Sequence, residues 1–476
     1  MTRIGTLSSR VTAPSLAVAL VVLLAGCKVF ETSAPPPEFS VPEAFDEAPA
    51  CGVCLSSQDL ADWWTVWRDP TLDRLIKNAL EANTDLRIAQ ARVAEARSLA
   101  TIMESALYPT VGAQGGQWGG AMQWNNPLVN AIPGGSHTFD AHLVGAAAGW
   151  EPDIFEGHAD DAEAARAAAL SVEEQLNGAR MIVVAEVAEN YQEARGLQRR
   201  LAVLDASIAT LEQMLRYVQA RYAAGQALAY DVTEVRERLE SQRGKRPVLV
   251  SLLDVRQRRL AVLTGRVPEK IERLSPPGTF AAPAVPRGQL PSDVLERRPD
   301  VRARALLVRA QVAKLSSAKT DLLPRFQISF FGGDGRLHFE GVPGLQGTGG
   351  LVGLTAQLPI FTAGRIEANI AANDARLEQA AADHDKSVLQ ALEEVEGAYG
   401  RRFGFDKRAA DIRQALENAK RNEKASIGLY EGGRKTFGDA VNAKLDAFER
   451  SDELIQTQMQ QAAATVQLYL ALGGGW

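Results

Sequence analysis

The apolar positions in the first half of the chain follow two different periods. Residues 83–105 carry apolar side chains at Leu86, Ala89 and Val93, a spacing that puts them on one face of a helix. Two strand-like segments follow, and then a run without proline that would extend roughly 100 Å as a helix at ~1.5 Å per residue. The elements predicted in order are a helix, two strands and two long helices: 83–105, 110–118, 139–150, 160–224 and 231–263.

The second half of the chain shows the same order of elements. Its first helix begins at Pro299, a residue suited to the first helical turn, and stops before Pro324. Two strands then flank a loop with eight glycines, and a second long run without proline follows. The predicted elements are again a helix, two strands and two long helices: 299–323, 325–331, 351–358, 364–431 and 439–472.

The two halves are related by a constant offset in sequence. Tyr191, Tyr222, Gly225 and Asp231 recur 208 positions later as residues of the same type: Tyr399, Tyr430, Gly433 and Asp439. A fixed offset of this kind indicates an internal duplication. The division that follows is a signal peptide, a tether, a first repeat, a linker and a second repeat: 1–26, 27–59, 60–265, 266–294 and 295–476.

The N-terminal residues resemble a bacterial lipoprotein signal. Two arginines precede an apolar run, and Leu24-Ala-Gly-Cys27 follows as a small-residue cleavage site. A transmembrane helix is the alternative, but the uncharged run 11–27 is short for spanning and contains Pro14. The resemblance implies that Cys27 becomes the lipid-modified first residue of the mature chain. Lys28 after this cysteine favours the outer membrane.

The other two cysteines, Cys51 and Cys54, have the spacing of a redox or metal motif. A metal site would need a second pair of ligands, and a thioredoxin-like site would need a surrounding βαβ unit. Neither pattern follows in the sequence. The pair is therefore interpreted as a local disulfide, which a periplasmic location permits, or as an inert pair of thiols.

Composition argues against two classes of function. Lys and Arg total 52 against 58 Asp and Glu, so no general electrostatic attraction to nucleic acid is expected. The five histidines are scattered, and the P-loop-like segment 428–436 has Arg434 inserted and follows a predicted helix instead of a strand. We therefore expect no cofactor, no metal site and no enzyme activity; a periplasmic lipoprotein enzyme is the alternative from another class.

Four strands per chain point to an oligomer. A membrane barrel needs at least about eight strands to close without exposed edges. Two copies would give eight strands and a filled interior, whereas three would give twelve and leave room for a channel. The long helices are rich in alanine, as at 162–169, which allows close approach of neighbouring helices. A coiled-coil scaffold would instead require sustained heptads.

Four motifs stand out besides the lipoprotein signal: Trp63–Pro70, Arg298–Val301, Leu358–Phe361 with Gly364, and Ala471–Trp476. Together these motifs resemble TolC-type outer-membrane factors, and the NodT-like lipoproteins among them. The resemblance implies a mainly helical, internally duplicated fold, in which a trimer forms a periplasmic α-barrel and a 12-stranded transmembrane β-barrel. The partners it implies are outer-membrane lipid, a periplasmic adaptor (membrane fusion) protein and an inner-membrane pump of the resistance-nodulation-division type. The function implied is a passive exit duct for small molecules; a type I protein-secretion channel is a further alternative.

The same resemblance implies a gate at the periplasmic entrance. Tyr430 and Lys435 occupy positions whose side chains bond to a carboxylate at Asp231, and Asp439 matches an acidic ring at the constriction. Asn442 departs from the family pattern, which often has a second acid there. The alternative is that Tyr430 packs, Lys435 is solvated and Asp439 is a residue favoured at a helix N-terminus.

Overall fold

The computed structural model describes most of the chain beyond the N-terminal segment. Cys27, Cys51 and Cys54 lie outside the described residues, so the lipidation and disulfide predictions are not tested by it. The described residues are 30, 32–37, 39–47, 60–121, 138–270, 273–275, 283–287, 289–339 and 343–474.

These residues form two compact units, and each unit draws on both halves of the sequence. We call them the strand unit and the hairpin unit. The strand unit contains 94–171 and 305–383, and the hairpin unit contains 37–93, 172–304 and 384–476.

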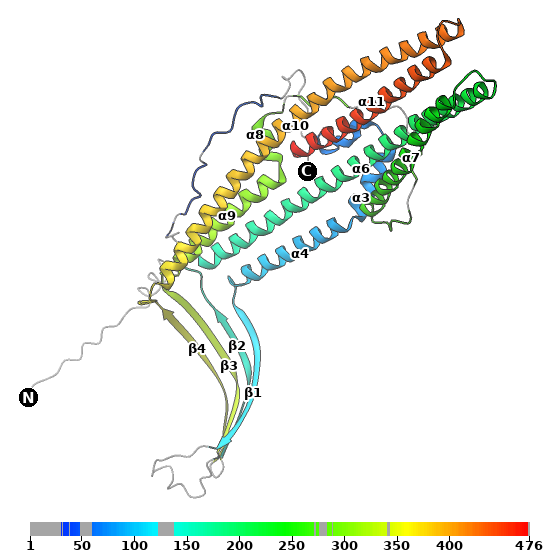
Figure 1. The fold of residues 1–476 in the computed structure, drawn as a ribbon. Coiled ribbons are helices and arrows are strands. Elements are labelled where there is room, and N and C mark those ends of the chain that lie inside the picture. Colours follow the sequence, from blue (N-terminus) through cyan, green and yellow to red (C-terminus); the bar gives the residue numbers. More distant parts are fainter. Residues whose placement is uncertain are drawn as a thin grey trace, which may run out of the picture. The chain divides into compact units, whose positions relative to one another are not determined.

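The strand unit holds one antiparallel sheet in the order β1-β2-β3-β4. The strand ends that connect to helices all lie at the same end of the sheet (Figure 1). Hydrogen-bonded pairing is one-to-one along each ladder, for example Ala146 opposite Ala113 and Ile328 opposite Leu354. The sheet confirms the four predicted strands. Their bounds are Thr110–Ala121, Thr138–Trp150, Arg325–Phe339 and Leu345–Gln357.

The glycine-rich segment 332–350 is mostly strand, so the prediction of a long loop there was wrong. Glycine weakens a strand because it has no side chain to pack, but it is required where two backbones approach closely. A Cβ on Gly145 would lie 2.4 Å from the Gly332 carbonyl oxygen, and a Cβ on Gly333 would lie 2.5 Å from the Val144 carbonyl oxygen. The glycines therefore permit the pairing of β2 with β3.

The long helices confirm the internal duplication. Helices α6 (Gly157–Ala223) and α10 (Arg365–Glu431) each have 67 residues, and α7 (Ala229–Leu263) and α11 (Phe437–Ala471) each have 35. All four bounds obey the 208-residue offset predicted from sequence. Shorter helices precede them in each half: η1 (Trp63–Trp67), α3 (Pro70–Ala82), α4 (Thr84–Ser105), α8 (Pro291–Arg297) and α9 (Pro299–Thr320).

The core of the hairpin unit contains residues from both repeats. Trp63 is 2% exposed and stacks on Tyr469, with ring centroids 5.2 Å apart. Tyr191 is fully buried, donates a hydrogen bond to Asp69 at 2.6 Å and accepts one from Arg195 at 2.7 Å. Burial, together with the bond to Asp69, raises the pKa of Tyr191 to about 12. The Trp63–Pro70 motif therefore anchors the first repeat.

Arg298 gives the second repeat a comparable anchor. Its side chain is 8% exposed, and its guanidinium lies 2.7 Å from carboxylate oxygens of both Asp300 and Glu394. It also donates to the carbonyl of Ala471 at 3.1 Å. A buried cation is stable only when its donors are satisfied, so this motif ties the start of α9 to α10 and to the end of α11.

Candidate gate at the ends of the helix hairpins

The two helix hairpins turn through the same backbone conformation. Gly225 after α6 has φ +70°, and Gly433 after α10 has φ +69°, a left-handed conformation that favours glycine. The N–H of Gln226 donates to the carbonyl of Arg221 at 2.8 Å, and the matching bond in the second hairpin is also 2.8 Å. This bond satisfies an otherwise unpaired carbonyl at the helix end. The predicted breaks at Gly225 and Gly433 are confirmed.

Both aspartates of the predicted gate lie in the first turn of a helix. Asp231 accepts the N–H of Leu228 at 2.8 Å. Asp439 accepts the N–H and hydroxyl of Thr436 at 2.9 and 2.7 Å, and its own N–H donates to the Thr436 hydroxyl at 3.1 Å. The latter is a reciprocal capping box. The bonds from Thr436, with a smaller contribution from the charge of Lys435, lower the pKa of Asp439.

Tyr430 and Lys435 both contact their own hairpin. The half-buried Tyr430 ring lies 5.5 Å from the ring of Phe437, which lies 4.2 Å from Tyr217. The exposed Lys435 donates to the Ser426 hydroxyl at 3.2 Å. Among the described residues of this one chain, no hydrogen bond joins Tyr430 or Lys435 to Asp231. The latch to Asp231 therefore stays a prediction.

The structure adds a residue that the sequence reasoning missed. Arg238 on α7 donates to Asn442 on α11 at 2.9 Å and to Glu234 on its own helix at 2.7 Å. The spacing of Glu234 and Arg238 is the ordinary signal of a helix ion pair. It gave no hint of the bond to Asn442. Asn442 thus joins the second hairpin to the first.

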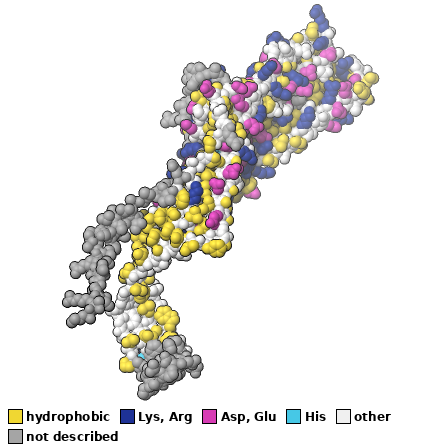
Figure 2. All heavy atoms as spheres, turned by 90° about the vertical axis from the view of Figure 1, so that its left-hand side faces the viewer, with side chains coloured by type: hydrophobic (Ala, Val, Ile, Leu, Met, Phe, Trp, Pro, Cys, Tyr) yellow, Lys and Arg dark blue, Asp and Glu magenta, His cyan; other side chains and the backbone are white. Residues whose placement is uncertain are grey.

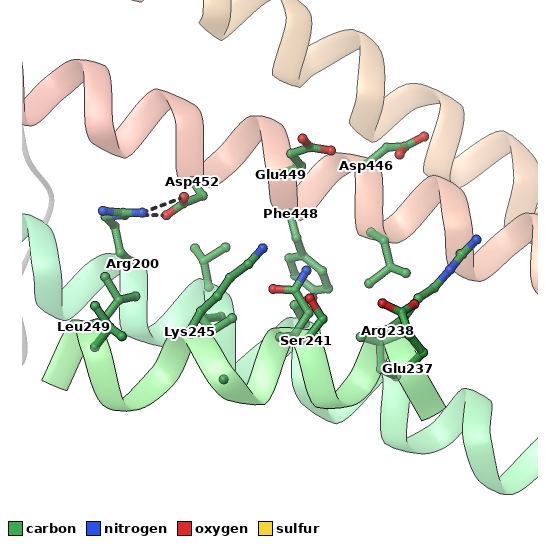
Figure 3. Close-up of a pocket in the computed structure, with 18 of the residues that line it drawn as sticks. Arg200, Glu237, Arg238, Ser241, Lys245, Leu249, Asp446, Phe448, Glu449 and Asp452 are labelled. Carbon is green, nitrogen blue, oxygen red and sulfur yellow. Dashed lines mark hydrogen bonds and ion pairs between the residues drawn. The ribbon is translucent and has the colours of Figure 1, made fainter. Parts of the chain in front are cut away.

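A second bond between the hairpins joins α6 to α11. Arg200 on α6 faces Asp452 on α11 and makes two bonds, at 2.8 and 3.1 Å (Figure 3). Paired bonds between guanidinium and carboxylate are among the stronger ionic contacts. The first hairpin is therefore held against α11 by Arg200 and by Arg238.

A groove of about 690 Å³ lies between α6, α7 and α11 beside these contacts (Figure 3). Its lining mixes charges of both signs, such as Lys245 and Glu449, with apolar residues such as Phe448. Within the described part of the chain, no group of three His, Cys, Asp or Glu residues could hold a metal ion. None of the described helices is long and apolar enough to cross a membrane.

Comparison with known proteins places this geometry in a family. Residues 75–266 and 290–474 match the model of the outer membrane efflux protein family. The chain is 26% identical over 412 residues to the solvent efflux pump outer membrane protein SrpC of Pseudomonas putida, covering 86% of each. It is 22% identical over 475 residues to the probable outer membrane lipoprotein SilC of Salmonella typhimurium, covering 97% of this chain and 98% of SilC.

A solved structure agrees with the sequence matches. The outer-membrane channel OprN superposes with a TM-score of 0.81 at 25% identity, covering 94% of this chain and 100% of OprN. The duplicated hairpins, the four-stranded sheet and the family model extend over the same residues. The chain belongs to the outer membrane efflux protein family.

Proposed function

We propose that three copies of this chain form a channel in the outer membrane through which an efflux pump discharges small molecules. The observation that carries the proposal is the sheet. Within the described chain β1 and β4 each pair with one neighbour only, so each keeps an edge of unpaired backbone groups. Such edges are costly in a bilayer unless another strand pairs with them. Three copies supply twelve strands and remove every edge.

The long hairpins supply the periplasmic part of the conduit. A helix of 67 residues reaches roughly 100 Å at ~1.5 Å per residue. Side-by-side packing of the two hairpins from each copy gives a helical tube. The duplication supports this assembly, because two similar hairpins per chain give six around the axis.

The chain is anchored by lipid at Cys27 and extends from the outer membrane into the periplasm. The Leu24-Ala-Gly-Cys27 signal supports the anchor, as does the name of SilC as a probable lipoprotein. Residues 27–59 serve as the tether, 60–265 and 295–476 as the repeats, and 266–294 as the linker.

The chain acts without catalysis and receives its cargo from partners. SrpC is named as a component of a solvent efflux pump, which supports an inner-membrane resistance-nodulation-division pump as the energy source. A periplasmic adaptor joins that pump to the inner end of the tube. Nucleic acid has no part in this assembly.

The entrance is closed by two sets of contacts. Within each chain, Arg238 and Asn442 hold the first hairpin to the second. Between chains, Tyr430 and Lys435 bond to Asp231 of the neighbour. Asp439 from three copies forms an acidic ring that favours cations. Each charge-assisted bond contributes on the order of 1.5–3 kcal/mol, which adaptor docking can offset.

Native mass spectrometry and planar-bilayer recording of the purified full chain test the proposal. We expect three copies in gentle detergent and discrete conductance steps after reconstitution. A monomer that keeps its strand content and conducts no current would overturn the assembly.

A further inference from the structure

The sheet has two faces whose composition can be followed strand by strand. Successive side chains alternate between faces, and directly paired residues share a face. The even-numbered residues of β2, β3 and β4 therefore lie with the odd-numbered residues of β1, and we call this the first face. A Cβ on Gly335 would lie 3.3 Å from the Leu143 side chain, which confirms that these two residues share the other, second face.

In the rows nearest the helices, the first face is apolar across all four strands. Phe330 is opposite both Ala148 and Val352, and Ala148 is opposite Val111. The second face of the same rows is polar. The apolar residues are Val111, Ala148, Trp150, Phe326, Ile328, Phe330, Val352 and Leu354, and the polar residues are Thr110, Arg325, Gln327, Ser329, Thr355 and Gln357.

In the rows nearest the loops, the two faces exchange character. The second face carries the large apolar residues here, and the first face carries the charged ones. Figure 2 shows hydrophobic side chains both where the sheet meets the helix ends and near its far end. The apolar residues are Trp118, Leu143, Leu337 and Leu345, and the polar residues are Asp140, His142, Asp334, Arg336, His338 and Gln346.

The exchange is not produced by a shift in the ladders. A bulge would turn the following residues onto the other face, but pairing is one-to-one from Arg325 with Gln357 to Leu337 with Leu345. The β2–β3 ladder is equally regular from Trp150 with Ile328 to Phe139 with Phe339. Each face therefore keeps its orientation while its composition changes near Gly145.

The helix-proximal rows decide which face meets lipid in a closed barrel. In these rows the second face carries Arg325 and two glutamines, whereas the first face is apolar across all four strands. The first face must therefore contact hydrocarbon there. Ile360 and Phe361, which follow β4, are 93% and 88% exposed.

We infer that the loop-proximal rows of the second face form an apolar collar inside the lumen, near the extracellular mouth. This inference rests on the proposed trimeric barrel and adds a property of its exit. The charged loop-proximal rows of the first face then lie outside the barrel, at the level of the outer-leaflet headgroups. The lumen is polar beside the helices and apolar at the collar, so the exit disfavours hydrated ions relative to apolar compounds.

Distances between spin labels in the trimer test the collar. Because neighbouring residues point to opposite faces, labels facing the lumen lie closer to their copies than labels facing outward. The collar pair is Leu345→Cys and Gln346→Cys, and the barrel control pair is Leu354→Cys and Thr355→Cys. All four side chains are exposed in one chain. Each variant also carries Cys51→Ser and Cys54→Ser, while Cys27 is kept for the anchor.

Double electron–electron resonance on the full chain in lipid vesicles gives the answer. We expect shorter distances between copies at Leu345 than at Gln346, and shorter at Thr355 than at Leu354. If the control pair behaves as expected but the distance at Gln346 is equal to or shorter than that at Leu345, the collar is overturned and the barrel stands. If the distance between copies at Leu354 is shorter than or equal to that at Thr355, the first face does not face lipid, and the collar is overturned. If no distance between copies is detected at any labelled position, the proposed trimer itself is overturned.

Discussion

The two hairpin turns share a backbone but differ in what their side chains do. Asp231 and Asp439 occupy the same position after Gly225 and Gly433. Asp439 accepts two bonds from Thr436, whereas Asp231 accepts one backbone bond from Leu228. Duplication has thus kept the turn, while Asp231 keeps more capacity to accept a donor from a neighbouring copy.

The exposed residues around the two turns differ as well. The first turn exposes Leu228 and Tyr230, each at 70%. The equivalent positions of the second turn, 208 residues later, are Thr436 and Gly438, next to the charged Lys435. The first turn therefore presents an apolar end and the second a polar one. Equal folds at the two ends do not imply equal roles in the gate.

The double substitution Tyr430→Phe with Lys435→Ser should have the largest effect on the channel. It removes a phenol and an ammonium, the two donors expected to bond to Asp231 of a neighbouring copy. Single-channel conductance in planar bilayers should rise severalfold. The control uses the equivalent positions of the first turn, Tyr222→Phe with Ala227→Ser. An equal rise in the control would mean that the latch does not belong to the second hairpin.

Arg238→Ala should raise conductance less, because it removes a contact within one chain and leaves the latch between copies in place. The bond to Asn442 is lost, while Arg200 and Arg199 still bond the first hairpin to α11. Arg243→Ala is the matched control, since Arg243 pairs with Glu212 inside the first hairpin at 2.6 Å. Conductance that rises alike in both variants would refute a role for the contact between hairpins.

Asp439→Asn should weaken cation preference with little change in conductance. The ring is charged only while Asp439 is ionised, and its lowered pKa keeps it ionised below the usual range of aspartate. The preference of the unmodified channel should therefore persist as pH falls to about 4, near the ordinary aspartate value, and fade only at lower pH. Reversal potentials in a salt gradient measure it. Asp446→Asn, on the same helix, serves as the control; an unchanged preference in Asp439→Asn would exclude the acidic ring.

Sequence predicted the elements that depend on local rules. The proline-free helices, the glycine turns and the 208-residue offset are readable because each follows from periodicity or from one residue type. The extents of β3 and β4 were missed, because Gly332 and Gly333 signal a loop locally, and only the approach of β2 explains them. The pairing with β2, and not the local sequence, therefore determines how far the strands extend.

The side-chain bonds of the candidate gate were less predictable than its position. Gly225 and Gly433 located both turns, but Arg238 and Asn442 are 204 residues apart, and nothing local connects them. The sequence singled out the Trp63–Pro70 motif only by resemblance. Its structural role is visible in the packed structure, where Asp69 accepts a hydrogen bond from the Tyr191 hydroxyl. Contacts between copies depend on surfaces that one chain does not determine.

The smallest effect is expected from removing one buried hydroxyl in each repeat. Tyr191 donates to the carboxylate of Asp69 and accepts from Arg195, whereas Tyr399 donates to the backbone carbonyl of Pro286 at 3.1 Å. Tyr191→Phe leaves two charged groups without this partner, and Tyr399→Phe leaves one carbonyl. A bond to a charged group is worth about 1.5–3 kcal/mol and a neutral one about 0.5–1.5 kcal/mol.

Thermal unfolding of the purified assembly compares the two variants directly. Both rings remain fully buried, so the lost hydroxyl is the main difference from the unmodified chain. Tyr191→Phe should lower the unfolding temperature more than Tyr399→Phe, while conductance stays unchanged in both because neither residue lies in the hairpin turns. Equal losses of stability would show that the two hydroxyls contribute equally. The two repeats would then differ at their turns but not at these buried tyrosines.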